Sequence, residues 1–268
     1  MAYVAAMPLA SVALDDLTID DEDSFSHVAL YGSLKKLLRR SGHRFLIPAD
    51  GAVASWDRTV FLNLTYWNAD QGADILCDRH LAADVVAHVA WHHAVSTHLA
   101  KIVGAAAAKS AAALFFAEAI ASAFDLYLVG RLLSNAPDSD FVSSQVPIMA
   151  EAAEQAGLSR DSFAALMDEV VRDPERAFED LRALLLDVTM ALFQCADAKE
   201  AQAALESFVG HRFASLLHHF QLSAWVLYAR AYGSADPNTD ATRAIRQLDV
   251  ALRQAPVSLD WLESNWAQ

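Results

Sequence analysis

The chain has 268 residues, of which 54% are hydrophobic, with only nine glycines and seven prolines. This composition favours packed helices around a sizeable core over a disordered chain or a turn-rich all-β fold. The net charge of −14 argues against a nucleic-acid partner, because the chain as a whole repels phosphates.

The cysteines and the hydrophobic stretches of the chain indicate the cellular compartment in which the protein is expected. Cys77 and Cys195 are the only cysteines and lie far apart, which is unlike the disulfide framework of a secreted protein. Residues 1–14 lack the basic start of a secretory signal. The longest apolar stretch, Ile102–Gly130, is rich in alanine and contains three charged residues, as is typical of a buried helix rather than a membrane span. We therefore expect a cytoplasmic protein with no membrane partner.

An acidic segment, residues 1–23, opens the chain and holds six carboxylates between Asp15 and Asp23. We expect a solvated loop here that caps the next helix, with a magnesium site at the Asp20-Asp21-Glu22-Asp23 cluster as the alternative. After the first helix, two stretches rich in β-branched and aromatic residues flank a Pro-Ala-Asp-Gly turn and predict a small β region. The elements expected in this part are a helix from Ser24 or Ser26 to about Arg40 and strands at His43–Pro48 and Thr59–Trp67.

The rest of the chain has the sequence pattern of helices. Ser159 and Asp173-Pro174 are start signals, because a side-chain oxygen can cap a helix and proline fits its first position. A polar connection between about 134 and 144 separates a part at 24–135 from a helical half at 143–268. The sequence thus predicts a mainly α protein with a small β region, an α+β fold. The expected helices are Asp78–Val103, Ser110–Leu133, one from Ser159, Pro174–Ala196, Lys199–Tyr232 and Thr239–Gln254.

The helix with five histidines between His80 and His98 concentrates the chemistry of the chain. Asp84, His88 and His92 are spaced four apart, so they form one stripe on the helix. Two imidazoles at this spacing can converge on one metal ion about 2 Å from each nitrogen. The other three histidines lie off the stripe, and we expect them at the surface or in supporting positions.

Glu118 is the expected third ligand. It lies in the most apolar helix of the chain, with no charged residue three or four positions away. An unpaired buried carboxylate is strongly destabilising, so this glutamate should have a cation, a metal ion or a proton beside it. Asp125, two turns further on, and Asp84 are expected to support the site by accepting a hydrogen bond from a histidine N–H.

The pattern His88-Val-Ala-Trp-His92, followed after 25 residues by Glu118, resembles the gluzincin branch of zinc metallopeptidases. Those enzymes carry His-Glu-x-x-His on one helix and a glutamate ligand on the next. The resemblance covers roughly residues 24–130 and implies a zincin-like half that binds zinc, followed by a helical half. Val89 stands where the family has the glutamate that acts as general base. The resemblance therefore implies a metal site without ordinary peptidase activity.

The resemblance also implies a histidine or tyrosine from the helical half that stabilises an oxyanion. The candidates for this catalytic role are His218, His219 and Tyr228. The alternative for each of them is a polar residue that faces solvent.

Three functions stay open at this point. The first is a zinc enzyme of hydrolase or lyase type, and the second is a non-haem iron oxygenase, because two histidines and one carboxylate also form the facial triad of iron(II) enzymes. The third is a non-catalytic helical binding protein. Aromatic residues near the expected ligands, Trp91, Phe115, Phe116 and Phe124, favour a small hydrophobic molecule as substrate. The oligomeric state stays open as well.

Overall fold

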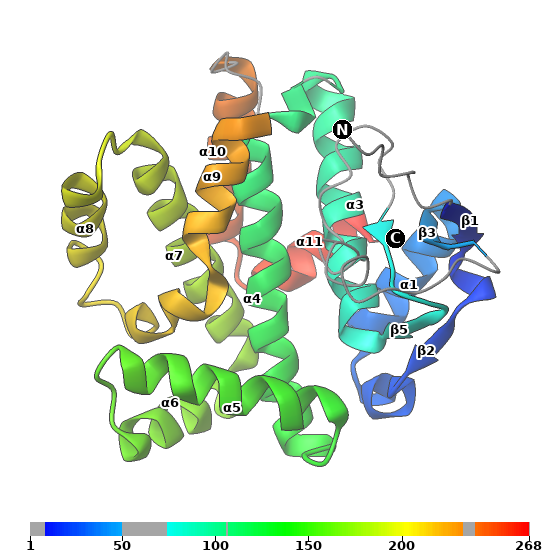
Figure 1. The fold of residues 1–268 in the computed structure, drawn as a ribbon, viewed down its shortest axis with the longest axis horizontal. Helices are drawn as coiled ribbons and strands as arrows, with labels where there is room; N and C mark the ends of the chain where they lie inside the picture. The colour runs from blue at the N-terminus through cyan, green and yellow to red at the C-terminus, as the bar shows by residue number, and fades with distance from the viewer. Residues whose placement is uncertain (1–8, 50–73, 106, 233–238, 268) are drawn as a thin grey trace, which may run out of the picture.

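A computed structural model describes residues 9–49, 74–105, 107–232 and 239–267 (Figure 1). Helices hold 76% of the described residues and strands hold 8%, which confirms the mainly α class with a small β region. The α-helices are α1 (Ala29–Ser41), α3 (Ala83–Val103), α4 (Ala111–Asn135), α5 (Asp140–Gln155), α6 (Arg160–Arg172), α7 (Pro174–Gln194), α8 (Ala198–Glu206), α9 (Leu222–Tyr232), α10 (Thr239–Gln254) and α11 (Ser258–Trp266).

The strands form two small sheets beside α1, at one end of the molecule (Figure 1). In one sheet β1 pairs antiparallel with β3, from Leu9 opposite Pro48 to Ala13 opposite Arg44, and β3 pairs parallel with β4. In the other sheet β2 pairs parallel with β5. The strand expected at His43–Pro48 is confirmed as β3, and the one expected at Thr59–Trp67 lies outside the described residues. The strands are β1 (Leu9–Ala13), β2 (Thr18–Asp20), β3 (Arg44–Pro48), β4 (Asp74–Ile75) and β5 (His80–Ala82).

The acidic N-terminal segment is not the solvated loop that the sequence predicts. It supplies β1 and β2, because its apolar residues can add strands to the sheets, and its carboxylates meet basic partners. Asp15 pairs with Arg39 at 2.7 Å, and Asp20 pairs with His80 at 2.9 Å. His80 consequently lies in β5, not on the histidine-rich helix, which begins only at Ala83. The first helix likewise begins later than expected, at Ala29, after a 3-10 turn.

Helix α4 is the centre of the fold, with α3 and α7 packed against it (Figure 1). The Ser110 hydroxyl caps it by accepting a hydrogen bond from Ala113 N at 3.3 Å. The helix is apolar on every side, as expected of a helix that is surrounded by others. It is long and apolar enough to cross a membrane, and 89% of its most apolar window is buried inside the protein. Buried side chains from both parts of the chain join it in one hydrophobic core.

The prediction of a single helix at Lys199–Tyr232 is wrong. The chain turns there twice and forms α8, the 3-10 helix η4 (Ala214–Phe220) and α9, with Gln221 in the left-handed conformation (φ 49°) between the last two. Each piece packs on a different neighbour, α8 on α7, η4 on α5 and α9 on α4 and α7. Contacts with these neighbours outweigh the local helix propensity of a continuous run.

Helix α4 lies close to the α6–α7 connection at Gly130. A Cβ atom there would lie 2.8 Å from the carbonyl oxygen of Val170 and 3.0 Å from Cβ of Pro174. We expect Gly130→Ala to lower the free energy of unfolding by about 1–3 kcal/mol, because overpacking outweighs the better helix propensity of alanine. The matched control is Gly32→Ala on α1, where a Cβ meets no atom within 4 Å.

In the control only the propensity gain acts, so Gly32→Ala should raise stability by about 0.5–1 kcal/mol. Urea unfolding followed by circular dichroism measures both variants. An equal stabilisation by the two substitutions would contradict the close packing of α4.

Candidate metal centre

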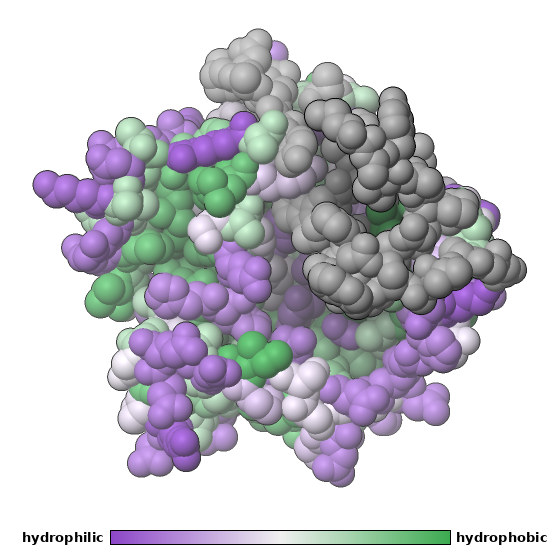
Figure 2. Space-filling view, viewed as in Figure 1, coloured by the Kyte–Doolittle hydropathy of each residue, from purple (hydrophilic) through white to green (hydrophobic). Residues whose placement is uncertain are grey.

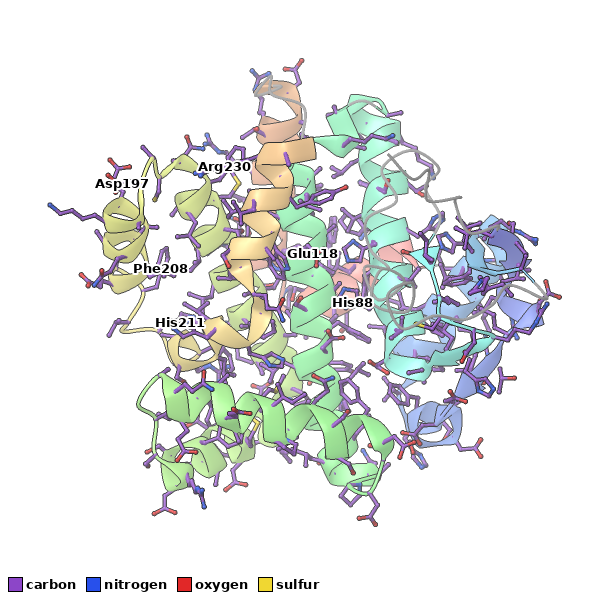
Figure 3. All side chains as sticks on the ribbon, viewed as in Figure 1. His88, Glu118, Asp197, Phe208, His211 and Arg230 are labelled. Carbon is purple, nitrogen blue, oxygen red and sulfur yellow. The ribbon has the colours of Figure 1, made fainter. Side chains whose placement is uncertain are left out.

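Helices α3 and α4 bring two histidines and one glutamate together (Figure 3). His92 Nε2 lies 3.7 Å from Glu118 Oε2, and His88 Nε2 lies 3.9 Å from the same oxygen. The three ligand atoms all lie within 4.8 Å of one another. His88, His92 and Glu118 therefore form a group that could hold a metal ion, with two donors from one helix and the third from the next.

The distances from the two histidine nitrogens to Glu118 Oε2 are closer to those between ligands of one metal ion than to hydrogen-bond distances. Ligand atoms about 2.0–2.1 Å from a tetrahedral metal lie about 3.3–3.5 Å from each other. The distances of 3.7 and 3.9 Å exceed this range by a few tenths of an ångström, and both are too long for a hydrogen bond. The two imidazole nitrogens lie within 4.8 Å of each other, so rotations of the side chains would be needed to bring all three atoms into the coordination range of one ion.

Asp125 orients one of the two histidines. Its Oδ2 lies 3.1 Å from Nδ1 of His88, so Nδ1–H donates to the carboxylate and Nε2 faces Glu118. This contact selects the tautomer in which a neutral His88 offers the Nε2 lone pair. Asp84, one turn before His88, acts on the His88 imidazole through its charge. Burial, with the charge of Asp125 in addition, raises the pKa of Asp84 to about 6.

Burial and charge set different protonation states for the three groups. Burial disfavours the imidazolium of His88, but the carboxylates of Asp125 and Glu118 outweigh it and raise the pKa of His88 to about 9. Burial, with the charge of His88 in addition, holds the pKa of His92 well below its usual value. Burial raises the pKa of Glu118 to about 7. Without a metal, the site at neutral pH therefore contains one charged and one neutral imidazole.

The three residues considered for catalysis lie in different surroundings. His219 on η4 is half-buried, and the charge of Asp125 acts on it while burial lowers its pKa. Its Nδ1 is buried and makes no hydrogen bond to any described residue. His218, its neighbour, is exposed and lines a cavity between α8 and α9. Tyr228 is half-buried on α9, a helix that packs against α4.

The position of the missing general base is apolar. Val89 is buried, with 2% of its surface exposed, and offers no group that can accept a proton. The aromatic residues expected near a substrate are core residues, because Trp91, Phe115, Phe116 and Phe124 have no exposed surface. Trp91 packs edge-on against Phe124, with ring centroids 5.6 Å apart. These rings support α3 and α4 from within rather than line an open pocket.

One histidine contact next to the group could not be predicted from the sequence. His93 packs edge-on against His43, with ring centroids 5.4 Å apart, and His43 Nε2 lies 2.9 Å from Asp74 Oδ2. Fifty residues separate the two histidines, so no local spacing could reveal this pair. His98 faces elsewhere and stacks on Trp266. His43, His93 and His98 do not belong to the group of His88, His92 and Glu118 on α3 and α4.

Comparisons with protein families, with curated proteins and with solved structures found no match to this chain. The site is consequently classified by its own atoms. Two imidazole nitrogens and one carboxylate oxygen, buried between two helices, define a candidate metal centre of the two-histidine, one-carboxylate class.

Metal binding at this group should depend on pH. A metal ion that enters below about pH 9 must displace the proton of His88, so the apparent affinity for Zn²⁺ should fall about tenfold from pH 8.5 to pH 7.5. Below about pH 7 the fall should steepen, because Glu118 then also binds a proton. Competition with a chromogenic chelator at each pH measures the affinity.

Asp125→Asn is the matched variant for this measurement. It removes the carboxylate that contributes most to the high pKa of His88, so the slope between pH 7.5 and pH 8.5 should flatten. An affinity of the unaltered protein that is constant over this interval would contradict the proton displacement.

Proposed function

We propose that the chain is a metal-dependent enzyme in which His88, His92 and Glu118 bind one divalent transition metal, zinc in the first place. The observation that carries the proposal is the convergence of two imidazole nitrogens and a buried carboxylate oxygen from two helices. This donor set is the one that zinc takes in hydrolytic sites, where the fourth position stays open. A cation would also compensate the burial of the Glu118 carboxylate.

The reaction we propose is of hydrolase or lyase type on a small molecule, not peptide hydrolysis. Zinc would supply Lewis-acid chemistry and a bound water of lowered pKa. Val89 removes the general base that the resembled peptidases use. Asp125 holds His88 in its ligand tautomer, and His219, on which the charge of Asp125 acts, is the group we assign to proton transfer.

An iron(II) oxygenase is the second candidate, favoured by the apolar Val89. Oxygen activation at a facial triad of two histidines and one carboxylate needs no base at that position. The third candidate is a helical binding protein without a metal. The identity of the bound metal separates the three, because zinc, iron and a metal-free folded protein are different outcomes of one measurement.

Elemental analysis of the purified protein should find about one metal ion per chain. His88→Ala and Glu118→Gln each remove one of the three ligands. The metal content of both variants should therefore fall below about a tenth of that of the unaltered protein. His27→Ala, which changes an exposed histidine of the N-terminal region, is the control and should keep the full content. A folded, metal-free protein that does not take up added zinc would contradict the proposal, and iron in place of zinc would favour the oxygenase.

Activity provides a second test. The zinc-loaded protein should hydrolyse a small activated ester such as p-nitrophenyl acetate and should leave casein intact, because Val89 cannot accept a proton. His219→Gln should lower kcat at least tenfold at unchanged zinc content, since it removes the assigned proton-transfer group. Full ester hydrolysis by the His88→Ala variant would show that the activity arises elsewhere on the protein.

A further inference from the structure

A cavity of about 1150 Å³ lies between α8 and α9, away from the metal centre. The end of α7 and the 3-10 helix η4 complete its lining. Figure 2 shows hydrophobic residues gathered on this face of the molecule, and Figure 3 shows Asp197 and Arg230 on facing sides of one end. Cavities of roughly 300–1,000 Å³ are the usual size of sites for small molecules, so this one has room for a sizeable ligand.

The walls of the cavity are apolar and open to solvent. Leu205 on α8 faces the cavity from one side, and Val226 and Leu227 face it from α9. Leu227 has 65% of its surface exposed, and Val209, also at the cavity, has 72%. Such exposure of large aliphatic side chains around one concave surface is typical of a binding site rather than of an ordinary protein surface.

The charges at the cavity disfavour an anion. Asp197 and Glu206 contribute two carboxylates, and Arg230 contributes the one formal cation of the described lining. The guanidinium Nη2 of Arg230 already donates to carbonyl oxygens at the C-terminal end of α7, those of Leu192, Phe193 and Cys195. Its charge is therefore directed at the helix terminus, where it complements the helix dipole. The carboxylate of Asp197 likewise caps the start of α8, where its Oδ1 accepts a hydrogen bond from Glu200 N at 2.9 Å. The three formal charges at the cavity, those of Asp197, Glu206 and Arg230, sum to one negative charge.

One wall can adapt to an occupant. No residue of α8 is buried, and α8 packs mainly on α7. Helices with little buried surface open at low free energy. His218 and Gln221 add hydrogen-bonding groups at the opposite side of the cavity.

We propose that this cavity binds an apolar small molecule that is neutral or cationic and carries no anionic group. The apolar walls bind its hydrocarbon part, and the carboxylates at the rim exclude anionic amphiphiles such as fatty acids. The site is separate from the metal centre. His218 lines the cavity, and none of His88, His92 and Glu118 does.

Two fluorescent probes with one aromatic skeleton test this proposal. N-phenyl-1-naphthylamine is neutral, and 8-anilinonaphthalene-1-sulfonate adds only a sulfonate. Both become bright in apolar surroundings. We expect saturable binding of the neutral probe at about one per chain, at least tenfold tighter than that of the sulfonate. Glu206→Gln should narrow this difference, because it removes one of the two repelling carboxylates.

The cavity is then located by a matched pair of variants. Ala201→Trp fills the cavity from α8 and should weaken binding of the neutral probe at least tenfold, whereas Ala203→Trp, on the exposed side of the same helix, should leave it unchanged. Circular dichroism verifies that both variants fold. His88→Ala should bind the probe normally, which separates this site from the proposed metal function.

Three outcomes would overturn the proposal. The first is the absence of saturable binding of the neutral probe, and the second is equal binding by the Ala201→Trp and Ala203→Trp variants. The third is a dimer, seen by analytical ultracentrifugation, that excludes the probe and that Ala201→Trp dissociates. In that case a second copy of the chain, not a small molecule, occupies the cavity.

Discussion

A carboxylate in the middle of an apolar helix is the constraint on which the site depends. Glu118 has 5% of its surface exposed on α4, a helix that other helices cover along most of its length. Burial raises its pKa to about 7, although the charge of His88 opposes the rise, which shows how unfavourable the carboxylate charge is at this place. The α3 histidines lie within 4 Å of it but too far for hydrogen bonds. A metal ion between the three groups would compensate this unfavourable burial.

The surrounding residues are arranged around the same constraint. Asp125, on the same helix as Glu118, contacts the ring nitrogen of His88 that faces away from the group. It thereby orients the ring, and its charge keeps a proton on His88 when no metal is present. A bound metal would replace this proton and would join α3 to α4 through side chains of both helices. Metal binding and the packing of the central helices are in this view coupled.

The convergence of the three side chains could be predicted from the sequence because its signals are local. The spacing of His88 and His92 depends only on helix periodicity, and Glu118 is conspicuous as a lone charge in an apolar run. The break of Lys199–Tyr232 into three pieces could not be predicted in this way, because it depends on which neighbours bury each piece. Nor could the sequence reveal that the acidic segment enters two sheets, since β1 and β2 pair with strands 35 and 62 residues away. Trp91 and the phenylalanines were expected near a substrate, and their complete burial follows from the packing of α3 on α4.

The most direct measurement of the central claim is an X-ray absorption spectrum of the protein loaded with one equivalent of zinc. We expect a first coordination shell of nitrogen and oxygen at about 2.0–2.1 Å, with the outer-shell signature of two imidazoles and no sulfur. The Glu118→Gln variant should lose this spectrum. A shell containing sulfur at about 2.3 Å would place the metal at a cysteine, and a shell without imidazole would place it away from His88 and His92. Either result would contradict the assignment of His88, His92 and Glu118 as the metal ligands.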